Sequence, residues 1–181
     1  MIRLHELSMF GVQSVCFNMR EPDREEIFNL LDHDSPVKLA YQVIEAIRMN
    51  GGRGRVAFVG PTPVAVVGFA MFRPGVWQII LFGTDRFKEA AIHMLRWIRE
   101  NADDLVTNHG GRRLQCESRQ GHDEAHAFLR RLGARAEGPL MRMYGKDGSS
   151  YQRYVWIVGD NDHVLLKLKR PEDVLLSHVN A

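Results

Sequence analysis

Residues 122–134 read HDEAHAFLRRLGA, and this stretch has the pattern of a short amphipathic helix together with its end. Apolar side chains recur at helical spacing, so the pattern predicts a helix from about Asp123 to Leu132 with one buried face. Gly133 follows the last apolar position and is typical of the left-handed residue that ends a helix. The residues expected on the buried face are Ala125, Phe128, Leu129 and Leu132.

Strand patterns lie on both sides of this helix. Residues 112–118 alternate Leu114, Cys116 and Ser118 with polar neighbours, as a half-buried strand does. Residues 140–144 and 151–158 flank the stretch Gly145-Lys146-Asp147-Gly148, which predicts a hairpin. The region from 112 to 158 therefore reads as strand, helix and a final pair of strands.

Three β-rich runs precede this region, at residues 55–59, 64–72 and 76–82. The segments that separate them, 60–63 and 73–75, are short and contain proline and glycine, which favour turns. Connections of this length join only antiparallel neighbours. The three runs therefore predict an antiparallel meander.

Another helix is expected directly after the third run. Asp85 is the candidate N-cap, and apolar residues follow at helical spacing until a polar, glycine-ended stretch at 101–111 closes the helix.

The first fifty residues predict an arm, a strand and two helices. Residues 1–12 show no clean period, and 15–19 form a short strand candidate. Asp23 and Glu26 match a capping box at the start of the first helix. Ser35, followed by proline, begins the second helix. The complete order is β, α, α, β, β, β, α, β, α, β, β.

Composition limits the classes of function. The chain has 181 residues, 45% hydrophobic and 25% charged, which fits one globular domain. The net charge of +2 does not favour specific nucleic-acid binding. Two distant cysteines, Cys16 and Cys116, are expected to be buried free thiols. With no signal-peptide pattern and no apolar run of about 18 residues, we expect no membrane span and a cytoplasmic protein.

The element order resembles the GCN5-related N-acetyltransferase (GNAT) superfamily, and residues 122–134 resemble one of its helix motifs. Ala125, Phe128, Leu132 and Gly133 fall on the matching positions. The resemblance implies an α/β (α+β) fold, in which helices flank a mixed, mainly antiparallel central sheet. It covers residues 15–158, between an N-terminal arm (1–14) and a C-terminal extension (159–181) that we expect to dock on a partner.

A second resemblance lies after the third β-rich run. Family members carry Gln/Arg-x-x-Gly-x-Gly/Ala there, and backbone N–H groups at the helix start bind the pyrophosphate of acetyl-CoA. Arg86 and Ala91 match this motif, whereas Glu89 replaces its first glycine. The residues that the resemblance assigns to the cofactor are Phe82, Gly83, Arg86, Phe87, Lys88, Glu89, Ala90, Ala91 and Ser118.

Catalytic residues cannot be assigned from the sequence. Where many family members have a tyrosine that protonates the leaving thiolate, this chain has Leu129, which has no transferable proton. Gln78 cannot act as a general base. Glu117 is a candidate, but an outward-facing strand residue of this kind is more often only a solvated charge. His122 and His126 are spaced i, i+4, but no third ligand is apparent, so no metal is expected.

Two hypotheses follow from the resemblance. Within the superfamily the chain looks most like GNAT-like proteins of tailed bacteriophages, which implies a structural or interaction component of a virion. Its acetyl-CoA binding would then be lost, and its partners would be other protein subunits or copies of itself. The alternative is an active acetyl-CoA-dependent N-acetyltransferase that acts on an amine of a protein or small molecule. Glu89, Leu129 and the lack of an evident base favour the first hypothesis.

Overall fold

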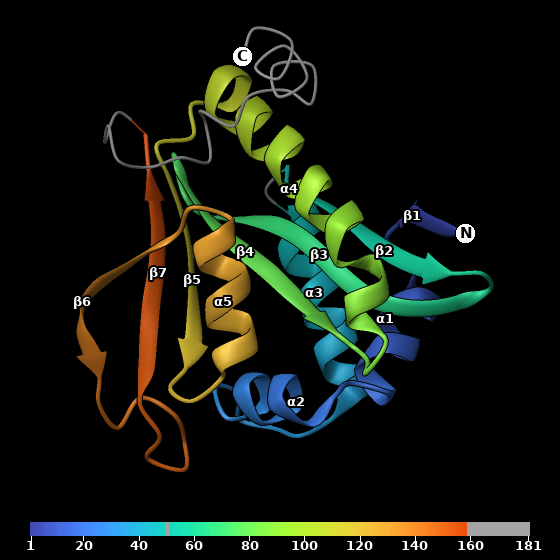
Figure 1. Cartoon of the computed structure of the whole chain (residues 1–181), viewed down its shortest axis with the longest axis horizontal. Coiled ribbons are helices and arrows are strands. Elements are labelled where there is room, and N and C mark those ends of the chain that lie inside the picture. Colours follow the sequence, from blue (N-terminus) through green and yellow to red (C-terminus); the bar gives the residue numbers. More distant parts are fainter. Residues whose placement is uncertain (50, 159–181) are drawn as a thin grey trace, which may run out of the picture.

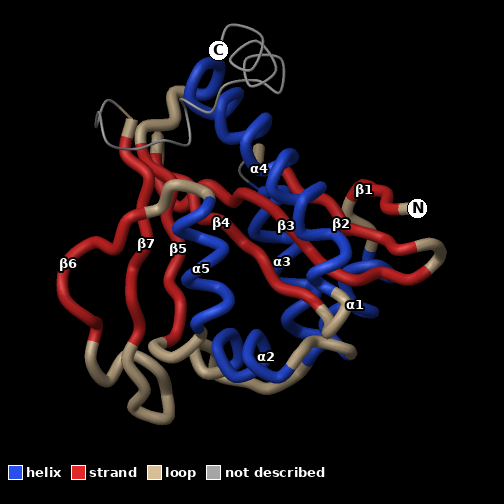
Figure 2. The backbone as a smooth tube through the Cα atoms, viewed as in Figure 1, coloured by secondary structure: helices blue, strands red, loops and turns tan. Residues whose placement is uncertain are grey.

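The computed structural model describes residues 1–49 and 51–158, which form a seven-stranded sheet with helices on both faces (Figures 1 and 2). The strands are β1 (Ile2–Glu6), β2 (Arg53–Val59), β3 (Thr62–Arg73), β4 (Val76–Gly83), β5 (Arg113–Arg119), β6 (Arg135–Met141) and β7 (Tyr151–Ile157). The helices are α1 (Met9–Phe17), α2 (Glu21–Phe28), α3 (Pro36–Met49), α4 (Phe87–His109) and α5 (Asp123–Arg131).

The strands lie in the order β1-β2-β3-β4-β5-β7-β6. Neighbours are antiparallel except β4 and β5, which are parallel. The meander predicted from residues 55–82 is confirmed as β2, β3 and β4. The strand predicted at 112–118 is confirmed as β5 in the same sheet.

Two hydrophobic clusters hold the helices on the sheet. One contains Trp77, Met94 and Trp156 and lies under α4 and α5. The other contains Val15, Ile44 and Phe82 and lies under α1 to α3. Successive residues of β4 alternate between the clusters, since Trp77 and Ile79 face α4 and α5 whereas Phe82 faces the other helices. In Figure 1, α5 lies in front of β5, and α1 and α3 lie behind β2 and β3.

Helix α3 approaches the sheet closely because two glycines face it. Gly54 and Gly68 are direct partners on β2 and β3. An added Cβ at Gly68 would lie 2.5 Å from Ile47 Cδ1 and 3.0 Å from the Arg53 carbonyl oxygen. The absence of side chains at this pair therefore sets the distance between α3 and the sheet.

The N-terminal region differs from its prediction. Residues 15–19, predicted as a strand, belong mostly to helix α1, whose N-cap Ser8 accepts a hydrogen bond from the Gly11 amide at 3.2 Å. The short apolar run at 15–17 suggested a strand, but the buried positions Val12, Val15 and Cys16 follow helical spacing. Residues 1–14, predicted as an arm, contain β1, which pairs with β2 along its whole length.

Two capping predictions were also wrong. Helix α2 begins at Glu21 with Arg20 as N-cap, so Asp23 lies inside the helix and is buried. At α4 the cap position is Arg86, and Thr84 Oγ1 accepts the Arg86 amide hydrogen at 3.2 Å in place of Asp85. Helix α4 also continues through the polar stretch at 101–109.

The final hairpin is confirmed, but its first strand lies earlier than predicted. β6 spans Arg135–Met141, and residues 142–150 form a long loop before β7. The predicted extension at 159–181 lies outside the described residues.

We expect Gly68→Ala to lower the free energy of unfolding by about 1–3 kcal/mol, because the added methyl overpacks Ile47. Combining it with Ile47→Val, which removes the Cδ1 atom, should restore part of that loss. Chemical denaturation of the two single variants and the double variant measures the coupling. Strictly additive effects would show that Ile47 does not limit the space at Gly68.

Candidate functional site

The sheet opens between β4 and β5. These strands pair at only three positions, from Val76–Arg113 to Gln78–Gln115, and then separate. Beyond the last pair at Gln78, from Ile79 to Gly83, β4 has a paired neighbour only on its β3 side among the described strands. At about 3.3 Å per residue, the opening extends ~16 Å along β4.

Helix α2 connects the separated ends of the two strands. Asp23 Oδ2 accepts the Gly83 amide hydrogen of β4 at 2.8 Å, and the Arg20 amide donates to the Gly83 carbonyl at 2.9 Å. Glu26 Oε2 accepts hydrogen bonds from Ser118 Oγ at 2.7 Å and from the Arg119 amide at 2.8 Å on β5. Side chains and backbone of α2 therefore satisfy groups that would otherwise lack a partner strand.

His122, at the start of α5, contacts both carboxylates of α2 and completes a polar cluster of Asp23, Glu26 and His122. Its Nδ1 lies 2.9 Å from Glu26 Oε2, and its Nε2 lies 3.4 Å from Asp23 Oδ1. Arg20 Nη2 forms an ion pair with Asp23 at 2.8 Å, and its guanidinium lies over the Phe87 ring. Burial raises the pKa of Asp23, although the hydrogen bond and charge of Arg20 oppose the shift. These contacts fix the side chains at one end of the opening.

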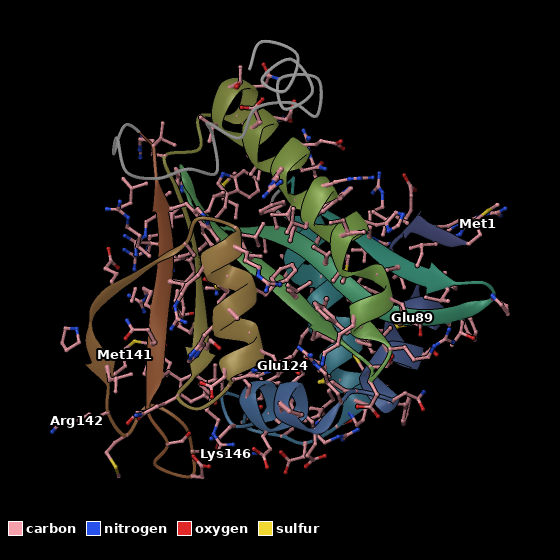
Figure 3. All side chains as sticks on the ribbon, viewed as in Figure 1. Met1, Glu89, Glu124, Met141, Arg142 and Lys146 are labelled. Carbon is pink, nitrogen blue, oxygen red and sulfur yellow. The ribbon has the colours of Figure 1, made fainter. Side chains whose placement is uncertain are left out.

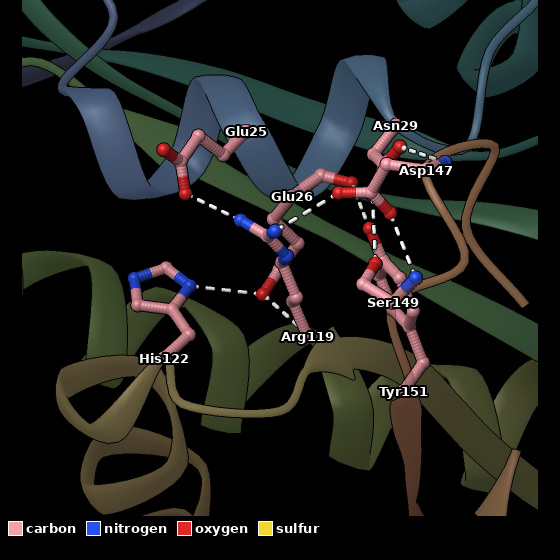
Figure 4. A network of polar contacts seen from close by, with 8 residues as sticks. All are labelled: Glu25, Glu26, Asn29, Arg119, His122, Asp147, Ser149 and Tyr151. Carbon is pink, nitrogen blue, oxygen red and sulfur yellow. Dashed lines mark hydrogen bonds and ion pairs between the residues drawn. The ribbon is translucent and has the colours of Figure 1, made fainter. Parts of the chain in front are cut away.

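A second layer of contacts holds α2 from outside (Figure 4). Tyr151 donates its hydroxyl hydrogen to the Glu26 carbonyl at 2.7 Å. Arg119 pairs with Glu25 and with Asp147, and Asn29 Nδ2 donates to Asp147 Oδ1 at 2.5 Å. Hydrogen bonds from Asn29 and Ser149 lower the pKa of Asp147. The 142–150 loop is thereby fastened to α2.

A cavity of about 400 Å³ lies at this opening. Apolar side chains of β4, α4 and α5 form one part of its wall, and the polar cluster of Asp23, Glu26 and His122 forms another. The lining includes Arg20, Asp23, Glu26, Ile79, Leu81, Phe87, Lys88, Ala91, Cys116, Glu117, Ser118, His122, Glu124, Ala125, Phe128, Leu129 and Arg131. Ala125 and Phe128, predicted as buried, are only half-buried because they face this cavity.

The residues that the sequence assigned to the cofactor lie around the opening, but only part of them line the cavity. Those that do are Phe87, Lys88, Ala91 and Ser118. Gly83 ends β4 and is bound to α2, whereas Phe82 and Ala90 are buried in the two hydrophobic clusters. Arg86 and Glu89 lie on the first turn of α4 outside the lining.

Glu89 forms an ion pair within the first turn of α4. Arg86 Nε and Nη2 donate to its two carboxylate oxygens at 2.7 and 3.1 Å. The hydrogen bond from Arg86 lowers the pKa of Glu89. A second pair, Lys88 with Glu124 at 2.7 Å, joins the starts of α4 and α5 (Figure 3). Both cations nearest the expected phosphate position are therefore already paired with carboxylates.

Glu117 lines two cavities. Besides the one at the opening, a groove of about 780 Å³ lies on the other face of β4, β5, β7 and β6. Among the described residues, Glu117 alone lines both. Gln78 Nε2 donates to its Oε2 at 2.8 Å and Arg153 Nε to its Oε1 at 3.0 Å, so the carboxylate is held in place.

The polar cluster of Asp23, Glu26 and His122 was not predicted from the sequence. The first two were assigned to a capping box, and His122 to an ordinary helix start. His122 lies about a hundred residues after Asp23 and Glu26 in the sequence, and only the fold brings the three side chains together. No local sequence pattern can predict such a contact. Leu129 lines the cavity.

His122 and His126 do not face a common site. His122 contacts the carboxylates of α2, whereas the His126 ring lies 5.3 Å from the Tyr154 ring. Within residues 1–49 and 51–158, no group of three or more His, Cys, Asp or Glu side chains could hold a metal ion. Cys116 lines the cavity, and burial raises the pKa of its thiol, so this cysteine stays protonated at neutral pH.

No protein-family model matches the chain, and no curated protein matches it by sequence. Solved structures do match. RimL, a ribosomal L7/L12 α-N-protein acetyltransferase in complex with coenzyme A, is 16% identical, with a TM-score of 0.67 over 87% of this chain and 94% of that one. A GNAT-family acetyltransferase from Streptococcus pneumoniae is 13% identical, with a TM-score of 0.62 over 88% and 100%. The chain has the GNAT fold.

A third match is spermidine N-acetyltransferase from Vibrio cholerae in complex with CoA and spermine. It is 13% identical, with a TM-score of 0.63 over 86% of this chain and 95% of that one. The GNAT-like fold predicted from the sequence is thus confirmed. For the part of the chain that the structure describes, no helix is long and apolar enough to cross a membrane.

His126 predicts a pH dependence of stability. Burial lowers the pKa of its imidazole below the ordinary value of 6.5, and its Nε2 has no hydrogen-bond partner among the described residues. The unfolded chain therefore takes up a proton near pH 6.5 that the folded chain resists, so stability falls as the pH decreases below that value. We expect the Tm of His126→Phe to fall less between pH 7.5 and 5.5 than that of the parent.

The exposed His5 on β1 provides a control, since His5→Phe should leave the pH dependence unchanged. Parallel curves of Tm against pH for the parent and His126→Phe would contradict the assignment.

Proposed function

We propose that this chain is an acetyl-CoA-dependent N-acetyltransferase that acts on an amine. The observation that supports it is the position of Glu117, the carboxylate that lines both the cavity at the opening and the groove on the other face. A group placed there can meet an acyl donor from one side of the sheet and an amine from the other. The RimL and spermidine N-acetyltransferase structures, which share the fold, contain CoA.

The residues at the opening fit acetyl-CoA. From Ile79 to Phe82, one edge of β4 has no partner strand in the described chain, so it can pair with an extended arm that contains amide groups. Ile79, Leu81 and Phe128 offer apolar surface to that arm. At the start of α4 the helix dipole favours phosphate, although the amides of Arg86, Phe87 and Glu89 already donate to acceptors within the turn.

Charged side chains of both signs lie near the expected position of the phosphates. Lys88 and Arg131 line the cavity and attract an anion, whereas Glu89 and Glu124 repel it. Because each of these carboxylates is paired with a cation, the repulsion is smaller than that of a free charge. The substitution of glycine by Glu89 therefore weakens phosphate binding without abolishing it.

Acetyl-CoA, when bound, supplies an acetyl group activated as a thioester. Glu117 accepts the proton that the amine loses as the new carbon–nitrogen bond forms and the carbon–sulfur bond breaks. Leu129 has no proton to give to the leaving thiolate, so that proton would come from solvent. An ionised carboxylate has about four acceptor sites. Gln78 and Arg153 use two of those on Glu117, which leaves room for the proton.

The hypothesis of a structural component of a virion rested on Glu89, on Leu129 and on the lack of an evident base. The ion pair of Glu89 with Arg86 and the position of Glu117 address the first and the last of these points within an enzyme, whereas Leu129 provides no proton donor. The comparisons likewise favour the alternative of an acetyltransferase.

Acetyl-CoA should raise the Tm of the purified protein. Ligand at 100 times its Kd stabilises by about 2.7 kcal/mol. Glu89→Gln removes one negative charge near the phosphates, so we expect its Kd to be lower by roughly two- to fivefold. Thermal-shift titration measures both effects, and Glu45→Gln on the exposed face of α3 is the control. No shift with the parent and no shift with Glu89→Gln would rule out cofactor binding.

Glu117→Gln should reduce kcat by roughly 10²–10⁴, the usual contribution of a general base. The variant keeps the shape of the side chain and should bind acetyl-CoA with unchanged affinity. Release of CoA thiol in the presence of an amine acceptor measures the rate across a pH series. If the variant keeps the full rate and the same pH profile, Glu117 is not the base.

A further inference from the structure

The groove lies on a part of the sheet that no described helix covers. Helices α1 and α3 pack on β2 and β3, and α5 lies on the opposite face (Figure 1). The groove follows the exposed face of β4, β5, β7 and β6. Its rim carries two aromatic side chains, Phe72 and Tyr144, which are 59% and 45% exposed.

A continuous row of hydrogen bonds forms the floor of the groove. Arg113 Nε donates to Gln115 Oε1 at 2.8 Å, and Gln115 Nε2 donates to Gln78 Oε1 at 3.3 Å. Gln78 then donates to Glu117. Each side-chain amide has two N–H groups and an oxygen with two lone pairs. Both glutamines therefore keep one donor and one acceptor site for another molecule.

These free amide sites match an extended peptide. A peptide backbone presents N–H and C=O groups at regular spacing, which side-chain amides can bind without regard to sequence. The exposed rings of Phe72 and Tyr144 offer apolar surface for its side chains. A polyamine, by contrast, has no carbonyl groups to accept hydrogen bonds from this floor.

The charges of the groove are not balanced. Arg113 pairs with Glu137 at 2.5 Å, and Arg153 pairs with Glu117. Arg73 lies over the Phe72 ring and has no carboxylate partner within the described chain. The lining thus contains three arginines and two glutamates, which leaves one positive charge at its Arg73 end. An acidic ligand is favoured at that end, and a multiply cationic amine is disfavoured.

We propose that the acceptor is the N-terminal α-amine of an extended peptide with an acidic residue near its fourth position, and that Arg73 binds this acidic side chain. This inference rests on the proposed acetyl transfer. Arg73 pairs with Val76 and Val76 with Arg113, which lies four residues before Glu117 on β5. At about 3.3 Å per residue along β5 and about 4.8 Å between strands, the Cα atoms of Arg73 and Glu117 are ~16 Å apart. Four residues of extended peptide span this distance together with the reach of the two side chains.

The test uses two octapeptides with free N-terminal amines that differ only in glutamate or lysine at the fourth position, with diaminobutane as a third acceptor. With the parent, kcat/KM should be highest for the glutamate peptide. Arg73→Glu should lower that value roughly tenfold, mainly through KM, because a charge-assisted contact is lost. The same variant should raise kcat/KM for the lysine peptide.

Arg3→Glu makes the same change of charge on the exposed edge strand β1 and should leave the preference unchanged. Equal rates for the two peptides, a faster reaction with diaminobutane, or equal effects of Arg73→Glu on both peptides would overturn the inference. In these cases acetyl transfer to some amine persists, so the proposed function stands. If acetyl-CoA produces no thermal shift and none of the three acceptors is acetylated, both proposals fail.

Discussion

The limited pairing of β4 with β5 is the constraint on which the rest of the molecule depends. Two parallel strands that stayed in register would close the sheet and leave no cavity. Here they pair at three positions and then separate, so the backbone groups at their ends need other partners. Helix α2 supplies them through Asp23 to Gly83 and through Glu26 to Arg119. The sheet can remain open because a helix, and not a strand, satisfies its ends.

That arrangement explains why charged side chains are buried at the opening. Asp23 is 3% exposed, and burial alone would disfavour its charged form. The ion pair with Arg20 and the amide of Gly83 offset part of this cost. Tyr151 and the loop that contains Asp147 then hold α2 in place. A buried polar cluster of this kind is stable only when each of its side chains has hydrogen-bond partners.

Elements with a strong local period could be predicted from sequence, and contacts between distant residues could not. The meander of β2 to β4 and helix α5, which Gly133 follows with a positive φ, could be predicted from hydrophobic spacing and turn residues. Helix α1 was missed because the apolar residues at 15–17 are also typical of a short strand. The tertiary structure shows that the buried residues of this segment lie at helical spacing. Asp23 was assigned to a cap because its actual partner, Gly83, lies 60 residues away.

The same limit applies to the site and defines the role of Glu117. Alternation along β5 correctly predicted that its side chain faces away from the core, where a solvated charge is the simplest interpretation. Its importance depends on where the strands separate, since a residue just beyond the last β4–β5 pair is the one that both faces of the sheet can reach. No other residue of β5 lines both cavities. The opening of the sheet, and not a sequence motif, therefore makes this residue the candidate base.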